Sequence, residues 1–205
     1  MPDGRRVRAY IGLGANVGDA RRTLAAAVRS LGALPGVRVR GVSRLFATRP
    51  VGVVDQPDFL NAVVALDVPA GSDPGSGALA LLLALKGLER AFGREVRGRW
   101  GPRELDLDLL VFGRNRIHLE RPSQGRSDDP ARTGAQWLDV PHIAAGERLF
   151  VLAPLADVAP GLVPPGWGAT VESRRRERVA IEGADTVRAV GIWDRTEGWR
   201  AQEPR

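Results

Sequence analysis

Two aspartates stand two residues apart in the segment Leu105-Asp106-Leu107-Asp108-Leu109-Leu110. The alternation of leucine with aspartate predicts a β-strand, in which residues i and i+2 point to the same face. Asp106 and Asp108 then project together, while Leu105, Leu107 and Leu109 project to the other side. Two carboxylates on one face can bind a hard divalent cation such as Mg²⁺, which prefers oxygen ligands. A solvated strand face would show the same pattern, so other residues must decide between the two.

A basic loop that contains glycine precedes this strand. Residues 93–103 hold three glycines and four arginines, Arg94, Arg97, Arg99 and Arg103. Guanidinium groups offer paired N–H donors that match phosphate oxygens, and glycines allow a loop to close over a ligand. Plain ion pairs and a nucleic-acid patch are the alternatives, but Trp100 is the only aromatic platform inside the loop. Together, the loop and the aspartates indicate phosphate transfer on a nucleotide.

Two other groups of residues have the chemistry to recognise small molecules. Asn61 stands near the start of an apolar strand, and its amide presents a donor and an acceptor that suit the edge of a heterocycle. Phe59 can stack on the same ring. A turn at the start of the strand would explain both residues equally well. His142 follows Pro141 and precedes Arg148, which is compatible with a phosphate or nucleotide site or with a structural histidine.

Hydrophobic periodicity and turn signals predict the elements that position these residues. A helix is expected after the N-cap Asp19, with Leu24, Val28 and Leu31 on its apolar stripe, ending at Gly32. The other expected elements are strands over residues 7–15, 37–48, 59–68 and 105–112 and a second helix over residues 78–92. The resulting order, βαββαβ, predicts a mixed α/β (α+β) fold. Its form would be a ferredoxin-like sandwich, with an antiparallel sheet and helices on one face.

The second half of the chain has weaker signals. We expect a strand over residues 116–120, a flexible loop over 121–136 and a helix over 149–156. Residues 173–178 form a run of charges, and residues 179–181 and 187–193 are expected to be short strands or a hairpin. The end of the chain from residue 195 is expected to be frayed.

The composition is that of one α/β domain. The chain has 205 residues, 43% of them hydrophobic, which suffices for one core. The absence of cysteine excludes disulfides and thiolate metal sites. No apolar run is long enough to span a bilayer, and the N-terminus lacks the pattern of a signal peptide. The net charge of +6, in a chain whose only lysine is Lys86, is compatible with a nucleotide or a nucleic acid as partner.

Together these motifs resemble the 6-hydroxymethyl-7,8-dihydropterin pyrophosphokinase (HPPK) family. The most specific match is Arg-Trp-Gly-Pro-Arg-x-Leu-Asp-Leu-Asp over residues 99–108. The other matching pieces run in family order, at residues 9–16, 48–52, 55–61, 89–94 and 141–150. The resemblance extends over about residues 7–165.

The resemblance implies a reaction in folate biosynthesis. The hydroxymethyl oxygen of the pterin would attack the β-phosphorus of ATP, which transfers diphosphate and releases AMP. Asp106 and Asp108 match the ligands of two Mg²⁺ ions, and Asp106 also lies where it could help to deprotonate the hydroxyl. The family's catalytic residues match Arg94, Arg103, Asp106 and Asp108. The ATP side matches Glu89, Arg94, Arg103, Leu109, His142 and Arg148. The pterin side matches Thr48, Pro50, Val51, Phe59, Asn61, Trp100 and Phe150.

Several positions depart from the family pattern. Ala15 stands where serine is frequent, and Val96 stands where a second loop arginine often lies. Trp137 and Asp139 replace a basic residue and a hydroxyl before Pro141. The contacts to adenine and the role of Arg97 are therefore open.

We expect a monofunctional, ATP-dependent diphosphotransferase over residues 1–170, with a C-terminal extension over residues 171–205. Its expected partners are ATP and the pterin, without nucleic acid or membrane, and it is expected to be a cytoplasmic monomer. Two alternatives remain. One is a ferredoxin-like module that binds nucleic acid, and the other is an inactive relative that serves as an interaction protein.

Overall fold

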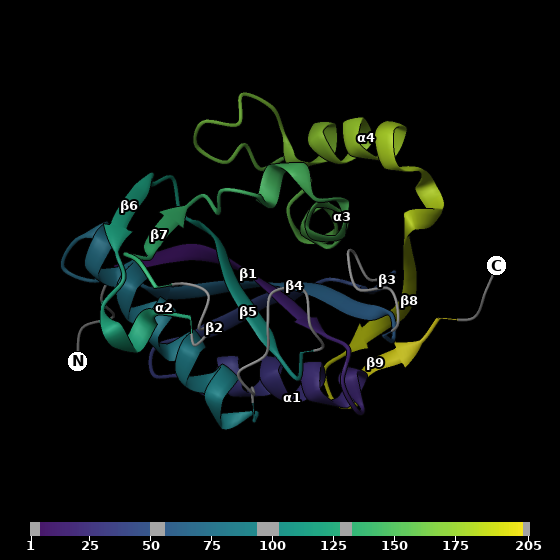
Figure 1. The fold of residues 1–205 in the computed structure, drawn as a ribbon, viewed down its shortest axis with the longest axis horizontal. Coiled ribbons are helices and arrows are strands. Elements are labelled where there is room, and N and C mark those ends of the chain that lie inside the picture. The colour runs from purple at the N-terminus through teal and green to yellow at the C-terminus, as the bar shows by residue number, and fades with distance from the viewer. Residues whose placement is uncertain (1–4, 50–55, 94–102, 128–132, 203–205) are drawn as a thin grey trace.

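The chain folds into three layers, with a sheet between two pairs of helices (Figure 1). The computed structural model describes residues 5–49, 56–93, 103–127 and 133–202. Within these residues the main sheet has the order β5-β1-β4-β3-β8-β9, and β2 also pairs with β4. Its strands are β1 (Arg6–Ala15), β2 (Arg38–Val42), β3 (Leu45–Thr48), β4 (Phe59–Pro69), β5 (Asp106–Phe112), β8 (Val187–Asp194) and β9 (Gly198–Ala201). All of its strand pairs are antiparallel.

Helices α1 (Ala20–Ala33) and α2 (Pro74–Ala91) cover one face of the sheet. The predicted stripe of Leu24, Val28 and Leu31 is buried, and Asp19 caps α1 by accepting a hydrogen bond from the backbone N–H of Arg22. Helix α2 starts earlier than residue 78, because Asp73 caps it through the N–H of Ser76 and a proline follows the cap.

Helices α3 (Leu149–Val158) and α4 (Val171–Glu182) lie over the opposite face. Strand residues alternate between the two layers: Ile11 packs with α1 and α2, whereas Tyr10 and Val63 pack with Leu152 and Leu155 of α3. The predictions of a mixed α/β fold and of an antiparallel sheet are confirmed. The prediction that the helices lie on one face holds for α1 and α2 of the βαββαβ unit but not for the later helices α3 and α4. Both faces of these central strands are apolar, and each needs a cover. The ferredoxin-like topology stays a prediction.

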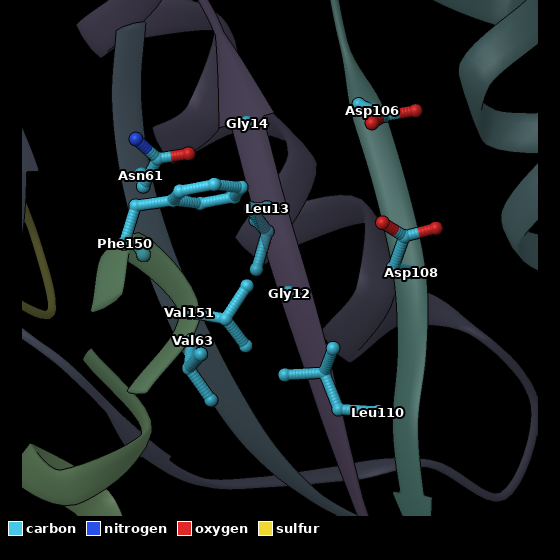
Figure 2. A pocket seen from close by; sticks show the side chains of 11 residues that line it. Gly12, Leu13, Gly14, Asn61, Val63, Asp106, Asp108, Leu110, Phe150 and Val151 are labelled. Atoms are coloured by element: carbon cyan, nitrogen blue, oxygen red, sulfur yellow. The ribbon is translucent and has the colours of Figure 1, made fainter. Parts of the chain in front are cut away.

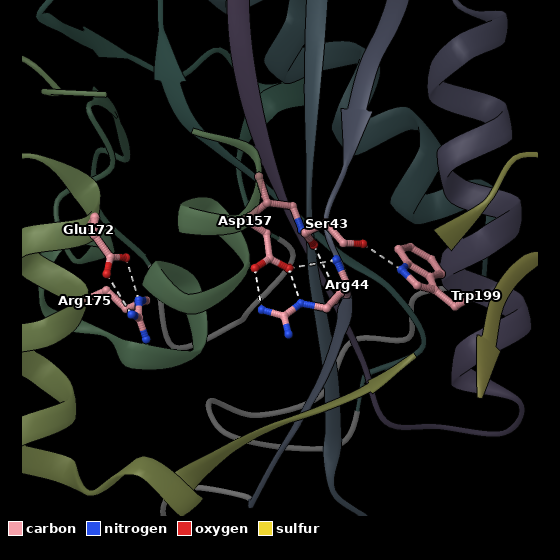
Figure 3. Close-up of polar contacts among 7 residues, drawn as sticks. Ser43, Arg44, Asp157, Glu172, Arg175 and Trp199 are labelled. Atoms are coloured by element: carbon pink, nitrogen blue, oxygen red, sulfur yellow. Dashed lines mark hydrogen bonds and ion pairs between the residues drawn. The ribbon is translucent and has the colours of Figure 1, made fainter. Parts of the chain in front are cut away.

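The strand predicted over residues 37–48 is in fact two strands, β2 and β3, broken at Ser43 and Arg44. The N–H of Val63 on β4 donates to the side-chain hydroxyl of Ser43 at 2.9 Å, where a regular strand pair would offer a backbone oxygen. Arg44 turns away from the sheet and donates three hydrogen bonds to Asp157 of α3 (Figure 3). The polar pair therefore interrupts the strand while it links the sheet to α3.

A small second sheet consists of β6 (Ile117–Glu120) and β7 (Trp137–Val140). Strand β6 was predicted, but β7 was not, because its four residues follow a polar segment. Within the described part of residues 121–136, Ser123–Gly125 form a 3-10 helix.

The C-terminal segment differs most from its predictions. Residues 173–181 are all helical and belong to α4, so the prediction of a short strand at 179–181 is wrong. The chain is not frayed over β9, since Trp199 is only 4% exposed and lies in the main core. Its indole Nε1 donates to the backbone oxygen of Ser43 at 2.8 Å (Figure 3). The boundary at residue 170 stays a prediction, although β8 and β9 belong to the same sheet as β1. None of the described helices is long and apolar enough to span a membrane.

Candidate active site

A pocket opens on the face of the sheet that α3 covers, between β4, β1, β5 and the start of α3 (Figure 2). Its floor on β1 contains Gly12 and Gly14. A Cβ atom at Gly14 would lie 3.4 Å from Oδ1 of Asn61, and one at Gly12 would lie 3.4 Å from Leu110. Because glycine has no side chain, neither position fills the space above β1. The remaining lining residues are Leu13, Asn61, Ala62, Val63, Asp106, Asp108, Leu110, Phe150 and Val151.

Asp106 and Asp108 both line this pocket from β5, as their spacing predicted (Figure 2). In the strand register Asp106 pairs with Gly14 and Asp108 with Gly12, so neither carboxylate faces a bulky neighbour on β1. Leu105, Leu107 and Leu109 are at most 3% exposed in the core on the opposite face. The alternation of the segment thus anchors the strand on one side and presents two carboxylates on the other.

Arg103 lies beside the first aspartate. Its guanidinium Nη1 donates to Oδ2 of Asp106, and its own main chain is held by Asn16 at the end of β1. Asn16 Oδ1 accepts from the N–H of Arg103 at 2.8 Å, and the N–H of Asn16 donates to the Arg103 oxygen at 3.0 Å. Asn16 is 3% exposed and also donates to Gln56 and to the backbone of Pro57. Asn16 therefore connects Arg103 with the residues that precede β4.

Asn16 was not among the predicted site residues. Its only signal in the sequence was its place in the motif over residues 9–16, since it lies 87 residues from Arg103. Two residues so far apart in the sequence form no local motif from which their contact could be predicted.

Asn61 faces the pocket from β4, and Phe150 faces it from α3 (Figure 2). The Asn61 Nδ2 donates to the hydroxyl of Thr48 on β3 at 2.9 Å, which fixes the orientation of the buried amide. Phe59 stands two residues before Asn61 on β4 and so shares its face. The guanidinium of Arg148 lies 5.7 Å from the centre of the Phe150 ring. Four residues predicted for the pterin side therefore lie close together.

The residues predicted for ATP are more dispersed. His142 follows a cis peptide bond between Val140 and Pro141, and its N–H donates to the oxygen of Leu110 on β5 at 2.9 Å. The Leu109 side chain is in the core, so only its main chain could meet a ligand. Glu89 on α2 is 2% exposed and accepts hydrogen bonds from Lys86 and from the N–H of Leu107. Pro50, Val51, Arg94, Arg97, Arg99 and Trp100 lie outside the described residues.

Comparison with known proteins identifies the family of this chain. The family described as 7,8-dihydro-6-hydroxymethylpterin-pyrophosphokinase (HPPK) matches residues 10–160. The chain belongs to this family. The family assignment made from the sequence is therefore confirmed, and the match includes Asn61, Asp106, Asp108 and Phe150.

Several relatives support the assignment. The chain is 41% identical over 159 residues to the 2-amino-4-hydroxy-6-hydroxymethyldihydropteridine pyrophosphokinase of Methylorubrum extorquens, covering 78% of this chain and 87% of the relative. It is 39% identical over 150 residues to the enzyme of the same name from Bacillus subtilis, covering 73% and 77%.

A solved structure of wild-type Plasmodium falciparum HPPK-DHPS with pteroate has the same fold. Its TM-score is 0.68 at 13% identity, over 97% of this chain and 48% of that chain. At this identity the likeness concerns the fold alone, and this chain spans about half the length of that protein.

Proposed function

We propose that this member of the HPPK family transfers diphosphate from ATP to 6-hydroxymethyl-7,8-dihydropterin, giving AMP and the pterin diphosphate in folate biosynthesis. The observation that carries the proposal is the pocket in which Asp106 and Asp108 face Asn61 and Phe150. One wall bears carboxylates for a metal-bound polyphosphate, and the other bears an amide and an aromatic ring for a heterocycle. Family membership does not favour the nucleic-acid module or the inactive relative.

Asp106 and Asp108 are the proposed ligands of Mg²⁺, with two ions expected. Their fit rests on the donor set, because two carboxylates on one strand face provide the few protein oxygens that Mg²⁺ takes when water and phosphate complete its shell. Among the described residues there is no cluster of three acidic or histidine side chains that would form a full protein cage for a metal. Bound Mg²⁺ supplies neutralisation of the polyphosphate charge.

The residues of the chain itself position and polarise the reactants. Arg103, tethered by Asn16, places a guanidinium at the carboxylate edge of the pocket, where it can bind a phosphate oxygen and stabilise negative charge that develops there. Asp106 lies beside Arg103 and is the proposed acceptor of the proton from the pterin hydroxyl. Arg94 is proposed to act on the phosphates with Arg103.

The pterin is proposed to lie between the ring of Phe150 and that of Phe59. The Asn61 amide, oriented by Thr48, would read the polar edge of the pterin through its donor and acceptor together. Pro50, Val51 and Trp100 complete the proposed pterin side. On the nucleotide side, the proposal includes Leu109 through its main chain, His142 and Arg148. Glu89 is proposed to serve this side through its hydrogen bond to the N–H of Leu107.

The test is to incubate the purified chain with Mg²⁺, ATP and 6-hydroxymethyl-7,8-dihydropterin and to separate the products by chromatography. We expect AMP and the pterin diphosphate in equal amounts. The matched control replaces the substrate with 6-methyl-7,8-dihydropterin, which lacks the attacking hydroxyl and should give no AMP. Formation of ADP, formation of AMP without the pterin, or no AMP at all would contradict the proposal. Salt-sensitive RNA binding in place of turnover would support the nucleic-acid alternative.

A monomeric state, a cytoplasmic location, the absence of a nucleic-acid partner and a catalytic domain over residues 1–170 belong to the same proposal. Light scattering coupled to size exclusion should give a mass near 22.0 kDa. A dimer mass would contradict the monomeric state.

A further inference from the structure

Helix α2 carries a buried ion pair beside the strand with the two aspartates. Lys86, the only lysine of the chain, is 8% exposed, and Glu89 is 2% exposed. The Lys86 Nζ donates to both carboxylate oxygens of Glu89 at 2.8 Å. Burial of two charges is costly and adds little stability compared with apolar packing, so such a pair calls for a role beyond stability.

The pair reaches the outer edge of β5. Glu89 Oε1 also accepts a hydrogen bond from the backbone N–H of Leu107 at 2.7 Å. Strand β5 is the last strand of the main sheet on this side within the described residues, so its outward N–H groups have no neighbouring strand there to accept them. A buried N–H must find a partner, and Glu89 provides it.

The hydrogen bond from Leu107 to Glu89 lies at the point of β5 that carries the two aspartates. Leu107 is the residue between Asp106 and Asp108, and its side chain is fully buried on the far side of the strand. The next fixed point on the edge is the oxygen of Leu110, which accepts from the N–H of His142. Leu110 is left out of the register with β1, where Ile11 pairs with Leu109 and Tyr10 with Val111. The edge is therefore held on both sides of Asp108.

We infer that Lys86 and Glu89 form a positioning pair, which holds β5 at Leu107 so that Asp106 and Asp108 keep the spacing needed to bind a divalent metal. The inference rests on the proposed function. The carboxylate of Glu89 fixes the strand, and the ammonium of Lys86 orients and neutralises this carboxylate. Glu89 then acts through the strand, which differs from the direct contact with ATP that the family resemblance implies.

Three variants separate these roles. Glu89→Ala removes the acceptor for the Leu107 N–H, Glu89→Gln keeps an acceptor but removes the charge, and Lys86→Met removes the ammonium. The matched control is Glu172→Ala on α4, which breaks another i,i+3 pair, with Arg175, far along the chain from the pocket. Each variant is measured as the full chain, with its folded state checked by circular dichroism.

The first readout is hydrogen exchange of the Leu107 amide by NMR, with Val64 in the central strand β4 as internal reference. The second is the affinity for the Mg²⁺ complex of α,β-methylene-ATP, measured by calorimetry with and without Mg²⁺. We expect Glu89→Ala to speed Leu107 exchange and to weaken the Mg²⁺-dependent affinity about 10–100-fold, the usual cost of removing a group that orients a metal ligand. We expect smaller effects in Glu89→Gln and Lys86→Met, and none from Glu172→Ala.

Unchanged Leu107 exchange in a folded Glu89→Ala chain would overturn the inference. Weakened nucleotide binding together with unchanged exchange would instead support a direct contact between Glu89 and ATP. If Glu89→Ala does not fold, Lys86→Met and Glu89→Gln decide by the same two readouts. A wild-type chain that makes no AMP would refute the proposed function, whereas the exchange of Leu107 would still decide whether the pair holds the strand.

Discussion

The main sheet ends differently at its two sides. On the side of β3, the C-terminal hairpin of β8 and β9 continues the ladder, and Trp199 fills the core beneath it. On the side of β5, the described residues add no further strand, and the contacts that hold the edge come from Glu89 on α2 and from the N–H of His142. On the β3 side the sheet is extended by backbone pairing to β8 and β9, whereas the β5 edge is held by a few point contacts.

This difference shows how one sheet combines stability with access. Strand β3 is paired on both sides, so its backbone groups bond to neighbouring strands. An edge that is held at separate points keeps its carboxylates available: the Asp106 side chain is 21% exposed in the pocket although the leucines beside it are buried. We therefore expect changes in β8 and β9 to affect stability and changes at the β5 edge to affect catalysis.

The largest effect that tests this separation is expected at Trp199. Trp199→Ala should lower the free energy of unfolding by about 3–5 kcal/mol, because it leaves a cavity in the main core. Activity per folded molecule should stay unchanged. Denaturant unfolding combined with an assay at low temperature measures both quantities.

The control for this variant is Trp199→Phe. It keeps most of the ring but loses the hydrogen bond to the oxygen of Ser43, and it should cost about 1 kcal/mol beyond the lost ring volume. A folded Trp199→Ala chain that has lost its turnover would show that the two sides are not independent.

The core of the fold could be predicted from the sequence because its signals are local. The stripe of Leu24, Val28 and Leu31 and the alternation around Asp106 and Asp108 each occupy a single element and need no partner to be recognised. The same alternation predicted that the two carboxylates share a face of the strand, and both line the pocket.

The C-terminal segment could be predicted only in part. A short strand or hairpin was expected over residues 187–193, where β8 lies, but α4 and β9 were not expected. Helix α4 has one buried apolar residue, Val171, and is covered by ion pairs such as that of Glu172 with Arg175, so it has no hydrophobic periodicity. Trp199 stands alone in a polar segment, and its hydrogen-bond partner Ser43 is 156 residues away. The contacts of Asn16 and of Lys86 were not predicted for a related reason. A polar side chain is buried where a partner elsewhere in the chain can bond to it, and the residues around it in the sequence do not reveal that partner.

A second prediction concerns Asn61, which lines the pocket from the central strand β4. Asn61→Ala should weaken pterin binding by about 1–3 kcal/mol, since the polar edge of the ring would lose its partner. Thr48→Val, which removes only the acceptor for the Asn61 amide, should have a smaller effect in the same direction. Fluorescence titration with the pterin measures both variants.

Nucleotide affinity provides the control for these variants, and it should not change in either of them. If Asn61→Ala weakened ATP and pterin equally, the pocket would not have separate walls for the two substrates.

The smallest expected effect is a dependence of α4 on pH. Hydrogen bonds from Arg175 and Arg176 lower the pKa of Glu172 from 4.5 to about 2. Since the folded pKa is lowered, this contribution to stability is complete above pH 4.5 and is lost as the pH falls toward about 2. The effect is small because ion pairs near the surface contribute little.

Amide exchange of α4 between these pH values measures this contribution. Exchange should become faster as the pH falls, after correction for its intrinsic dependence on pH, and Glu172→Gln should remove the change. An equal acceleration in β5 would mean that the effect is not confined to α4.

The most direct test of the central claim is the single-turnover rate of AMP formation in Asp106→Asn and Asp108→Asn. Each substitution keeps the size of the side chain and removes the charge that a metal requires. We predict that both variants keep the circular dichroism spectrum and thermal stability of the wild type, while the rate falls at least about a hundredfold in each. A folded variant of either aspartate that forms AMP at the rate of the wild type would contradict the assignment of the β5 edge as the catalytic site.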